Sequence, residues 1–210
     1  MSDDIARLIG AVTREVRNES YEGKAAKIVV ASRDYDTDIE DLWDAISNPE
    51  RLPRWFAPVH GEFKLGGRYQ VQGNAGGTIT RCEPPRELAL TWEFAGGVSW
   101  VEVSLREAGA GARLELRHIA HPEEHWDKFG PGAVGVGWEL GLMGLDRHLA
   151  DPSATKPPES DENWHSTPDA KRFLRGSAED WGRADAAAGS DADAARERAE
   201  LTRKFYSGEG

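Results

Sequence analysis

The sequence predicts an α+β fold in which a curved antiparallel sheet closes around one long C-terminal helix. Three observations predict it. Residues 60–120 are short apolar runs separated by glycine- and proline-rich breaks, which is typical of an antiparallel meander. Residues 132–150 form one apolar segment of helical length, and residues 24–56 read as a strand followed by two short helices.

The meander shows the period of two that is expected for a half-covered sheet. In residues 87–94 large apolar side chains alternate with small or charged ones, and residues 113–120 repeat the pattern. This register directs His118 to the covered side. The alternating residues expected inward in the first segment are Leu88, Leu90, Trp92 and Phe94.

Before the meander, residues 24–35 are rich in β-branched residues and predict a strand. The capping-box pattern at 37–40 then predicts the start of a short helix, which Asn48-Pro49 ends because proline cannot continue the hydrogen-bond ladder. A second short helix is expected to carry Trp55 and Phe56.

The segment 132–150 contains interior glycines, each of which costs a helix roughly 1 kcal/mol relative to alanine. Gly137, Gly141 and Gly144 share one helical face. We therefore expect another element to approach this face closely.

Both ends of the chain are expected to be helical. Ile5, Leu8, Ile9, Val12 and Val16 have the spacing of an amphipathic helix over residues 3–17. Beyond the long helix, good helix starts at 167–168 and 190–191, with a break at Gly189, predict two more helices. These should pack on the body of the chain or on a second subunit, which would make a homodimer through the terminal helices.

The expected organisation therefore has four parts. They are an N-terminal helical segment at 1–23, the α+β domain at 24–150, a linker at 151–162 rich in Pro, Ser, Asp and Glu, and a helical C-terminal extension at 163–210.

The formal net charge of −11 disfavours nucleic acid and anionic membrane surfaces as partners. The single cysteine, Cys82, fits a reducing compartment, and the acidic N-terminus lacks the apolar stretch of a signal peptide. Charged residues in 132–150 indicate a buried helix and not a membrane span. We expect a bacterial, cytoplasmic protein.

The residues show no recognisable catalytic constellation and no cofactor site. His118, His121 and His125 occur at the end of a strand that runs into a proline-containing loop, which gives no reason for them to converge on a metal. No carboxylate pair lies on an inward face, and Cys82 has no pattern that would activate it, so it is expected to be structural.

Seven short segments have a distinctive composition and order. They are 41–45 (DLWDA), 48–51 (NPER), 54–58 (RWFAP), 66–69 (GGRY), 82–86 (CEPPR), 90–92 (LTW) and 137–138 (GW). These motifs resemble those of proteins similar to the activator of the 90-kDa heat-shock-protein ATPase, a branch of the START-related SRPBCC superfamily. The resemblance covers about residues 25–150 and implies a helix-grip fold.

The expected function is the binding of a small apolar or aromatic molecule in a cavity between the sheet and the long helix. Such sites are typically apolar and aromatic with a few polar groups. Two alternatives use the same fold: a cyclase- or hydrolase-type enzyme with His118 as acid or base, and a chaperone-cofactor-like protein-interaction module. The expected ligand-binding residues are Trp55, Phe56, Tyr69, Trp92, Trp100, His118, Trp138 and Met143. The alternative is that the aromatic residues only fill the core and that His118 is a buried histidine with a hydrogen-bond partner of its own.

Overall fold

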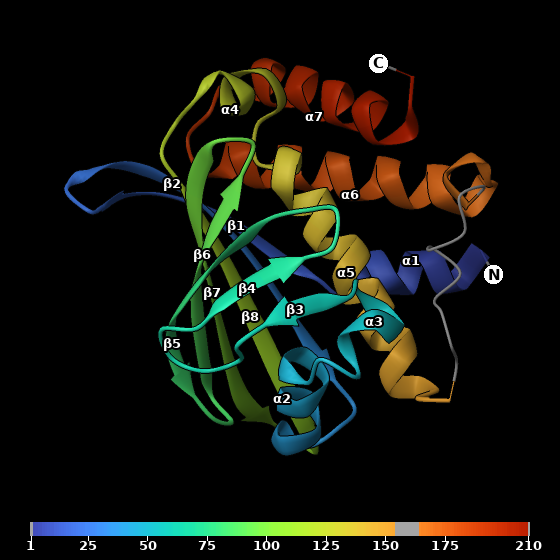
Figure 1. The fold of residues 1–210 in the computed structure, drawn as a ribbon. Coiled ribbons are helices and arrows are strands. Elements are labelled where there is room, and N and C mark those ends of the chain that lie inside the picture. The colour runs from blue at the N-terminus through green and yellow to red at the C-terminus, as the bar shows by residue number, and fades with distance from the viewer. Residues whose placement is uncertain (1, 154–163, 210) are drawn as a thin grey trace. The chain divides into compact units, whose positions relative to one another are not determined.

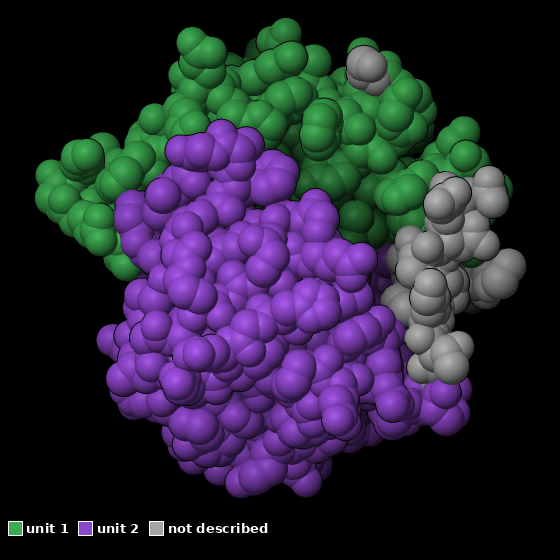
Figure 2. All heavy atoms as spheres, in the orientation of Figure 1, with its two compact units in different colours: residues 1–31, 121–140, 158–210 green, residues 32–120, 141–157 purple. Residues whose placement is uncertain are grey.

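The computed structural model describes residues 2–153 and 164–209. The chain divides into two compact units, shown in green and purple in Figure 2. Unit 1 comprises residues 1–31, 121–140 and 158–210, and unit 2 comprises residues 32–120 and 141–157. Each unit is described by itself below.

The described residues form an eight-stranded antiparallel sheet and seven α-helices (Figure 1). The strand order is β1-β2-β8-β7-β6-β5-β4-β3. This confirms the predicted α+β class and the antiparallel meander. The strands are β1 (Thr13–Tyr21), β2 (Lys24–Tyr35), β3 (Val59–Gly61), β4 (Arg68–Val71), β5 (Gly76–Glu83), β6 (Glu87–Phe94), β7 (Gly97–Ala108) and β8 (Gly111–Ala120).

Several helices begin where the sequence signals place them. Thr167 caps the helix that follows it, and Asp38 caps the first helix after β2 by accepting a hydrogen bond from the Asp41 amide. No described helix is long and apolar enough to cross a membrane. The helices are α1 (Ser2–Gly10), α2 (Ile39–Ser47), α3 (Leu52–Trp55), α4 (Glu124–Phe129), α5 (Gly132–Ala150), α6 (Pro168–Ala187) and α7 (Ala192–Ser207).

The predicted helix over residues 3–17 is wrong beyond Gly10, because the chain turns there and Thr13–Tyr21 forms β1. Val12 and Val16 are buried as expected, but on a strand. Positions four apart share a face in a helix and also in a strand, so this pair could not distinguish the two. The helix α4 was not predicted, since its segment is short and polar.

In unit 1 the two tail helices form as predicted, on either side of the break at Gly189. They pack within the chain: α6 contacts α1, β1 and α7. A side chain on Gly176 of α6 would overlap Ile9 of α1, and one on Gly182 would overlap Ala199 of α7. The tail is thus a partner of the N-terminal apolar stripe. Most of the expected linker at 151–162 lies outside the described residues.

In unit 2 the second half of α5 packs against β2 and α3. The fully buried Arg33 pairs with Asp146, and the Tyr35 hydroxyl donates to the Leu142 carbonyl at 3.3 Å. Gly144 lies so close to the Trp55 carbonyl that a Cβ at this position would overlap it. The close approach expected on the glycine face is therefore real at Gly144.

Candidate functional site

One face of the unit 2 sheet, which we call the inner face, carries a compact apolar cluster. Its members are contributed by the start of α3 and by strands β3, β4 and β5. Seven further apolar residues pack against this cluster but are only partly buried. The buried members are Leu52, Val59, Tyr69, Val71 and Ile79, and the partly buried ones are Trp55, Phe56, Ala57, Cys82, Leu88, Leu90 and Trp92.

The polar tips of two aromatic residues in this group are bonded to the backbone. The Trp55 indole N–H donates to the Ala45 carbonyl at 2.9 Å, and the Tyr69 hydroxyl donates to the Thr91 carbonyl at 2.7 Å. Trp55 also contacts Phe56, with ring centroids 5.5 Å apart. These bonds fix the rings in place and leave their apolar faces for packing or for a ligand.

His118 belongs to the same face. The strand register forms one cross-strand row of Ile79, Leu90, Val101 and His118, and directly paired residues in antiparallel strands share a face. His118 is 5% exposed, which agrees with the prediction that its side chain points inward. Burial lowers its pKa to about 4, so the imidazole is neutral at physiological pH.

The buried His118 predicts acid sensitivity. The unfolded chain takes up a proton on this histidine near its ordinary pKa of 6.5, whereas the folded protein holds it neutral down to about pH 4. The stability contributed by neutral His118 is therefore complete above pH 6.5 and is lost as the pH falls. We expect a loss of about 2 kcal/mol between pH 7 and pH 5. Urea unfolding of wild type and His118→Gln should show a shallower pH slope in the variant; equal slopes would contradict this assignment.

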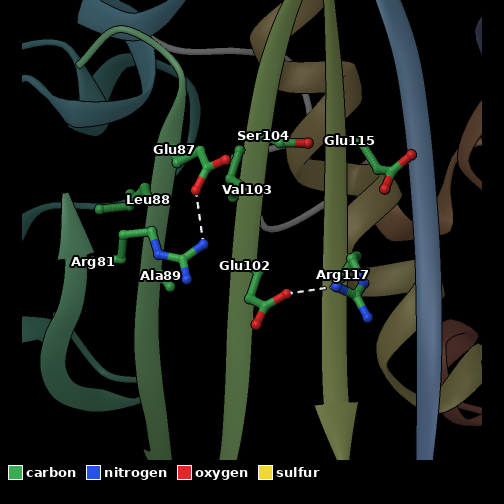
Figure 3. A pocket seen from close by; sticks show the side chains of 9 residues that line it. All are labelled: Arg81, Glu87, Leu88, Ala89, Glu102, Val103, Ser104, Glu115 and Arg117. Atoms are coloured by element: carbon green, nitrogen blue, oxygen red, sulfur yellow. Dashed lines mark hydrogen bonds and ion pairs between the residues drawn. The ribbon is translucent and has the colours of Figure 1, made fainter. Parts of the chain in front are cut away.

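The opposite, outer face of the unit 2 sheet holds a polar hollow of about 160 Å³ (Figure 3). Arg81 pairs with Glu87 and Arg117 pairs with Glu102, each at 2.7 Å, across its walls. Its charges thus largely neutralise one another. The other lining residues are Leu88, Ala89, Val103, Ser104 and Glu115.

The other two histidines of the strand-end motif have structural contacts. The ring of His121 bonds the Ala25 carbonyl at 2.9 Å, and the ring of His125 packs on Phe129 with centroids 4.8 Å apart. Among the described residues, no three His, Cys, Asp or Glu side chains are grouped as a metal site would require.

A family model described as "Activator of Hsp90 ATPase homolog 1-like protein" matches residues 36–150. This span holds every residue of the inner-face cluster and more than half of the chain. The chain belongs to this family. The membership confirms the resemblance drawn from the motifs of the meander and the first helices.

Among solved structures, this chain is similar to CalU16 from Micromonospora echinospora. The crystal structure of CalU16 is 31% identical, covers 83% of this chain and 98% of CalU16, and superposes with a TM-score of 0.68. Its solution structure is 30% identical, covers 85% of this chain and 97% of CalU16, and gives a TM-score of 0.71.

A more distant likeness shows the fold alone. The protein MLL2253 from Mesorhizobium loti is 20% identical, with a TM-score of 0.54 over 60% of this chain and 98% of its own. None of the curated proteins matches the chain.

The structure brings together most of the residues that the sequence singled out. Trp55, Phe56, Tyr69 and Trp92 belong to the inner-face group. His118 shares that face, and Met143 is fully buried on the unit 2 part of α5. Trp138 belongs to unit 1, whereas the other residues of this set belong to unit 2.

Trp100 does not lie where the sequence argument placed it. It pairs with Thr91 and Ile119, whereas the inner-face residue Val101 pairs with Leu90 and His118. Trp100 is therefore on the outer face. The two-residue turn between β6 and β7 fixes the pairing of these strands. Pairing the residues of β6 and β7 outward from that turn would have predicted the face on which Trp100 lies. Phe94 lies on the same face of β6 as Trp92, as predicted, but it is 57% exposed because it is next to the turn.

Sequence reasoning did not include the non-aromatic members of the group as site residues. Leu88 and Leu90 were expected inward but only as core, and Cys82 was expected to be structural; all three pack beside the aromatic residues. Ala57 had no signal of its own beyond its place after Trp55 and Phe56.

Proposed function

We propose that the chain binds a small apolar or aromatic molecule against the inner face of unit 2, between the sheet and the second half of α5. The observation that carries this proposal is the set of seven partly buried apolar side chains that pack against a buried apolar cluster. Part of the surface of these side chains stays accessible, which gives an apolar or aromatic ligand a surface to contact.

Neutral His118 supports the same proposal. In the row that crosses the face, it is the polar group on an otherwise apolar set of side chains. Apolar sites commonly use a few such groups to orient the ligand. A neutral imidazole can offer either a donor or an acceptor to a hydroxyl or carbonyl group of an uncharged ligand.

The test is a titration with N-phenyl-1-naphthylamine, an uncharged aromatic probe, followed by its fluorescence and by tryptophan quenching. Fatty acids, flavonoids and polyketides are then used as competitors. We expect saturable binding, and a roughly three- to tenfold loss of affinity in Trp92→Leu, because one aromatic contact contributes about 0.5–1.5 kcal/mol.

Trp100→Leu is the matched control, because Trp92 and Trp100 are partly buried tryptophans on adjacent strands but on opposite faces. Its affinity for the probe should equal that of wild type. Native mass spectrometry of the purified protein gives an independent reading through a co-purified apolar ligand. Absence of saturable binding across the whole panel, or equal losses in both variants, would overturn the proposal.

A further inference from the structure

The start of α3 is tied to α2 and to the last turn of α5 by one arginine. Arg51 Nη1 donates to Asp41 at 2.7 Å and to Asp44 at 3.0 Å, both on α2. Its Nε donates to Nε2 of His148 on α5 at 3.1 Å. The three elements therefore meet at a side chain that is well shielded from solvent, with a side-chain exposure of 16%.

The hydrogen bond from Arg51 determines the protonation state of His148. A ring nitrogen that accepts a hydrogen bond carries no proton, so the neutral imidazole holds its proton on Nδ1. This Nδ1 is buried and has no hydrogen-bond partner among the described residues. Protonation of Nε2 would direct its N–H at the Arg51 N–H, which replaces a hydrogen bond by two facing donors.

The surrounding charges also oppose protonation. The pKa of His148 is lowered first by burial and then by the nearby guanidinium groups of Arg51 and Arg54, while the Asp41 carboxylate opposes them. Arg54 is itself held near the end of α5 by a bond from its Nη1 to the Pro152 carbonyl at 3.0 Å. A charged His148 would therefore face two cations across the contact.

This contact is continuous with the candidate site. α3 ends at Trp55 and is followed by Phe56, and both are members of the inner-face group. The same short segment rests on α5 at Gly144 and Gly141. Displacing α3 from α5 would therefore move two aromatic members of the site.

We propose that the Arg51–His148 contact is a proton-sensitive latch that holds α3 on α5 at neutral pH and releases it in acid, opening the inner face. Opening of the inner face would also release a bound ligand, and this consequence rests on the proposed function. The release of α3 itself does not, because it concerns only the packing of three elements within unit 2.

Two measurements on the wild-type chain test the latch directly. Nitrogen-15 NMR of the imidazole at about pH 7.5 should show His148 as the Nδ1–H tautomer, with a titration below the ordinary range for histidine. Amide exchange, corrected for its intrinsic rate, should show that protection of the Phe56 amide, which donates to Leu52, falls about tenfold between about pH 7.5 and pH 5. The Ile79 amide of β5, which donates to Gly67, reports global opening, and its protection should fall in acid in wild type and in His148→Gln, because His118 lowers global stability in both.

A substitution at His148 distinguishes the effect of its titration from that of the other histidines. His148→Gln keeps an acceptor for Arg51 but does not titrate, so the protection of the Phe56 amide should become independent of pH, while that of Ile79 still falls in acid. His60→Gln, at an exposed histidine of β3, should keep the wild-type profile. Should His148→Gln fail to fold, the wild-type tautomer and exchange data still decide. An Nε2–H tautomer, or a Phe56 protection in wild type that does not change with pH, would overturn the latch.

The effect of the latch on ligand binding is tested by measuring the affinity for N-phenyl-1-naphthylamine in the same variants. Wild type and His60→Gln should lose about tenfold in affinity between about pH 7.5 and pH 5, and His148→Gln should lose none. If the probe binds at no pH while the exchange data show the latch, the proposed function fails and the latch stands. If it binds with equal affinity at both pH values, its release by the latch is refuted.

Discussion

Gly144→Ala should destabilise unit 2 by about 3 kcal/mol, although alanine favours a helix by about 1 kcal/mol over glycine. A Cβ at this position would overlap the backbone oxygen of Trp55. A backbone atom cannot move aside as a flexible side chain can, so α3 or α5 must shift. Urea unfolding measures the loss, and faster exchange of the Phe56 amide would locate it at α3.

Gly141→Ala is the matched control on the same helical face. Its Cβ would lie 3.8 Å from Phe56 and 3.9 Å from Trp55, which is ordinary van der Waals contact. We therefore expect a neutral or slightly stabilising change, of up to about 1 kcal/mol from helix propensity. The same glycine-to-alanine substitution at two positions one turn apart should thus change the free energy of unfolding in opposite directions. Equal stability of Gly144→Ala and wild type would show that the approach of α3 is looser than the structure has it.

Glu139→Gln should lower the stability of unit 1 by about 3–5 kcal/mol, the range measured when one partner of a buried ion pair is removed. Glu139 is fully buried and accepts from Arg14 Nε at 2.6 Å and from Nη2 at 2.7 Å. The amide of glutamine would place a donor against the guanidinium and leave its charge with Asp180, 3.0 Å away, as the remaining carboxylate partner.

A double variant that removes both charges of the pair is the sharper test. Arg14→Met combined with Glu139→Leu should recover at least half of the lost stability, since an apolar pair of similar volume avoids the desolvation of two charges. Arg17→Ala is the surface control: its partner Glu15 is 53% exposed, and we expect a loss of under about 1 kcal/mol. A double variant less stable than Glu139→Gln would contradict this expectation.

The elements that the sequence predicted well are those with a strong local signal. The strand 24–35 and the long helix 132–150 have the predicted bounds, and the helix after Thr167 starts at its cap. Their apolar periods and capping residues are properties of contiguous residues, so no distant contact is needed to recognise them. The N-terminal segment lacked such a signal, because Val12 and Val16 fit a helix and a strand equally.

In the candidate site, too, the features with a local sequence signal were predicted and the others were not. Residue parity along β6 and β8 is enough to predict that Trp92 and His118 share one face, and the strand register confirms it. The face of Trp100 depended on the hairpin register, which was in the sequence but was not used. The pairs Arg51–His148 and Arg14–Glu139 had no local signal, since their members are 97 and 125 residues apart.

The sequence by itself thus determined the class of fold, the family and the aromatic character of the inner face. These follow from short-range patterns, because side-chain period and turn chemistry act over a few residues. The tertiary structure alone decided which charges are paired, which glycine of α5 carries the close approach, and what covers the N-terminal apolar stripe. Each depends on two segments meeting in space, and a charged or small side chain does not encode its distant partner in the residues around it.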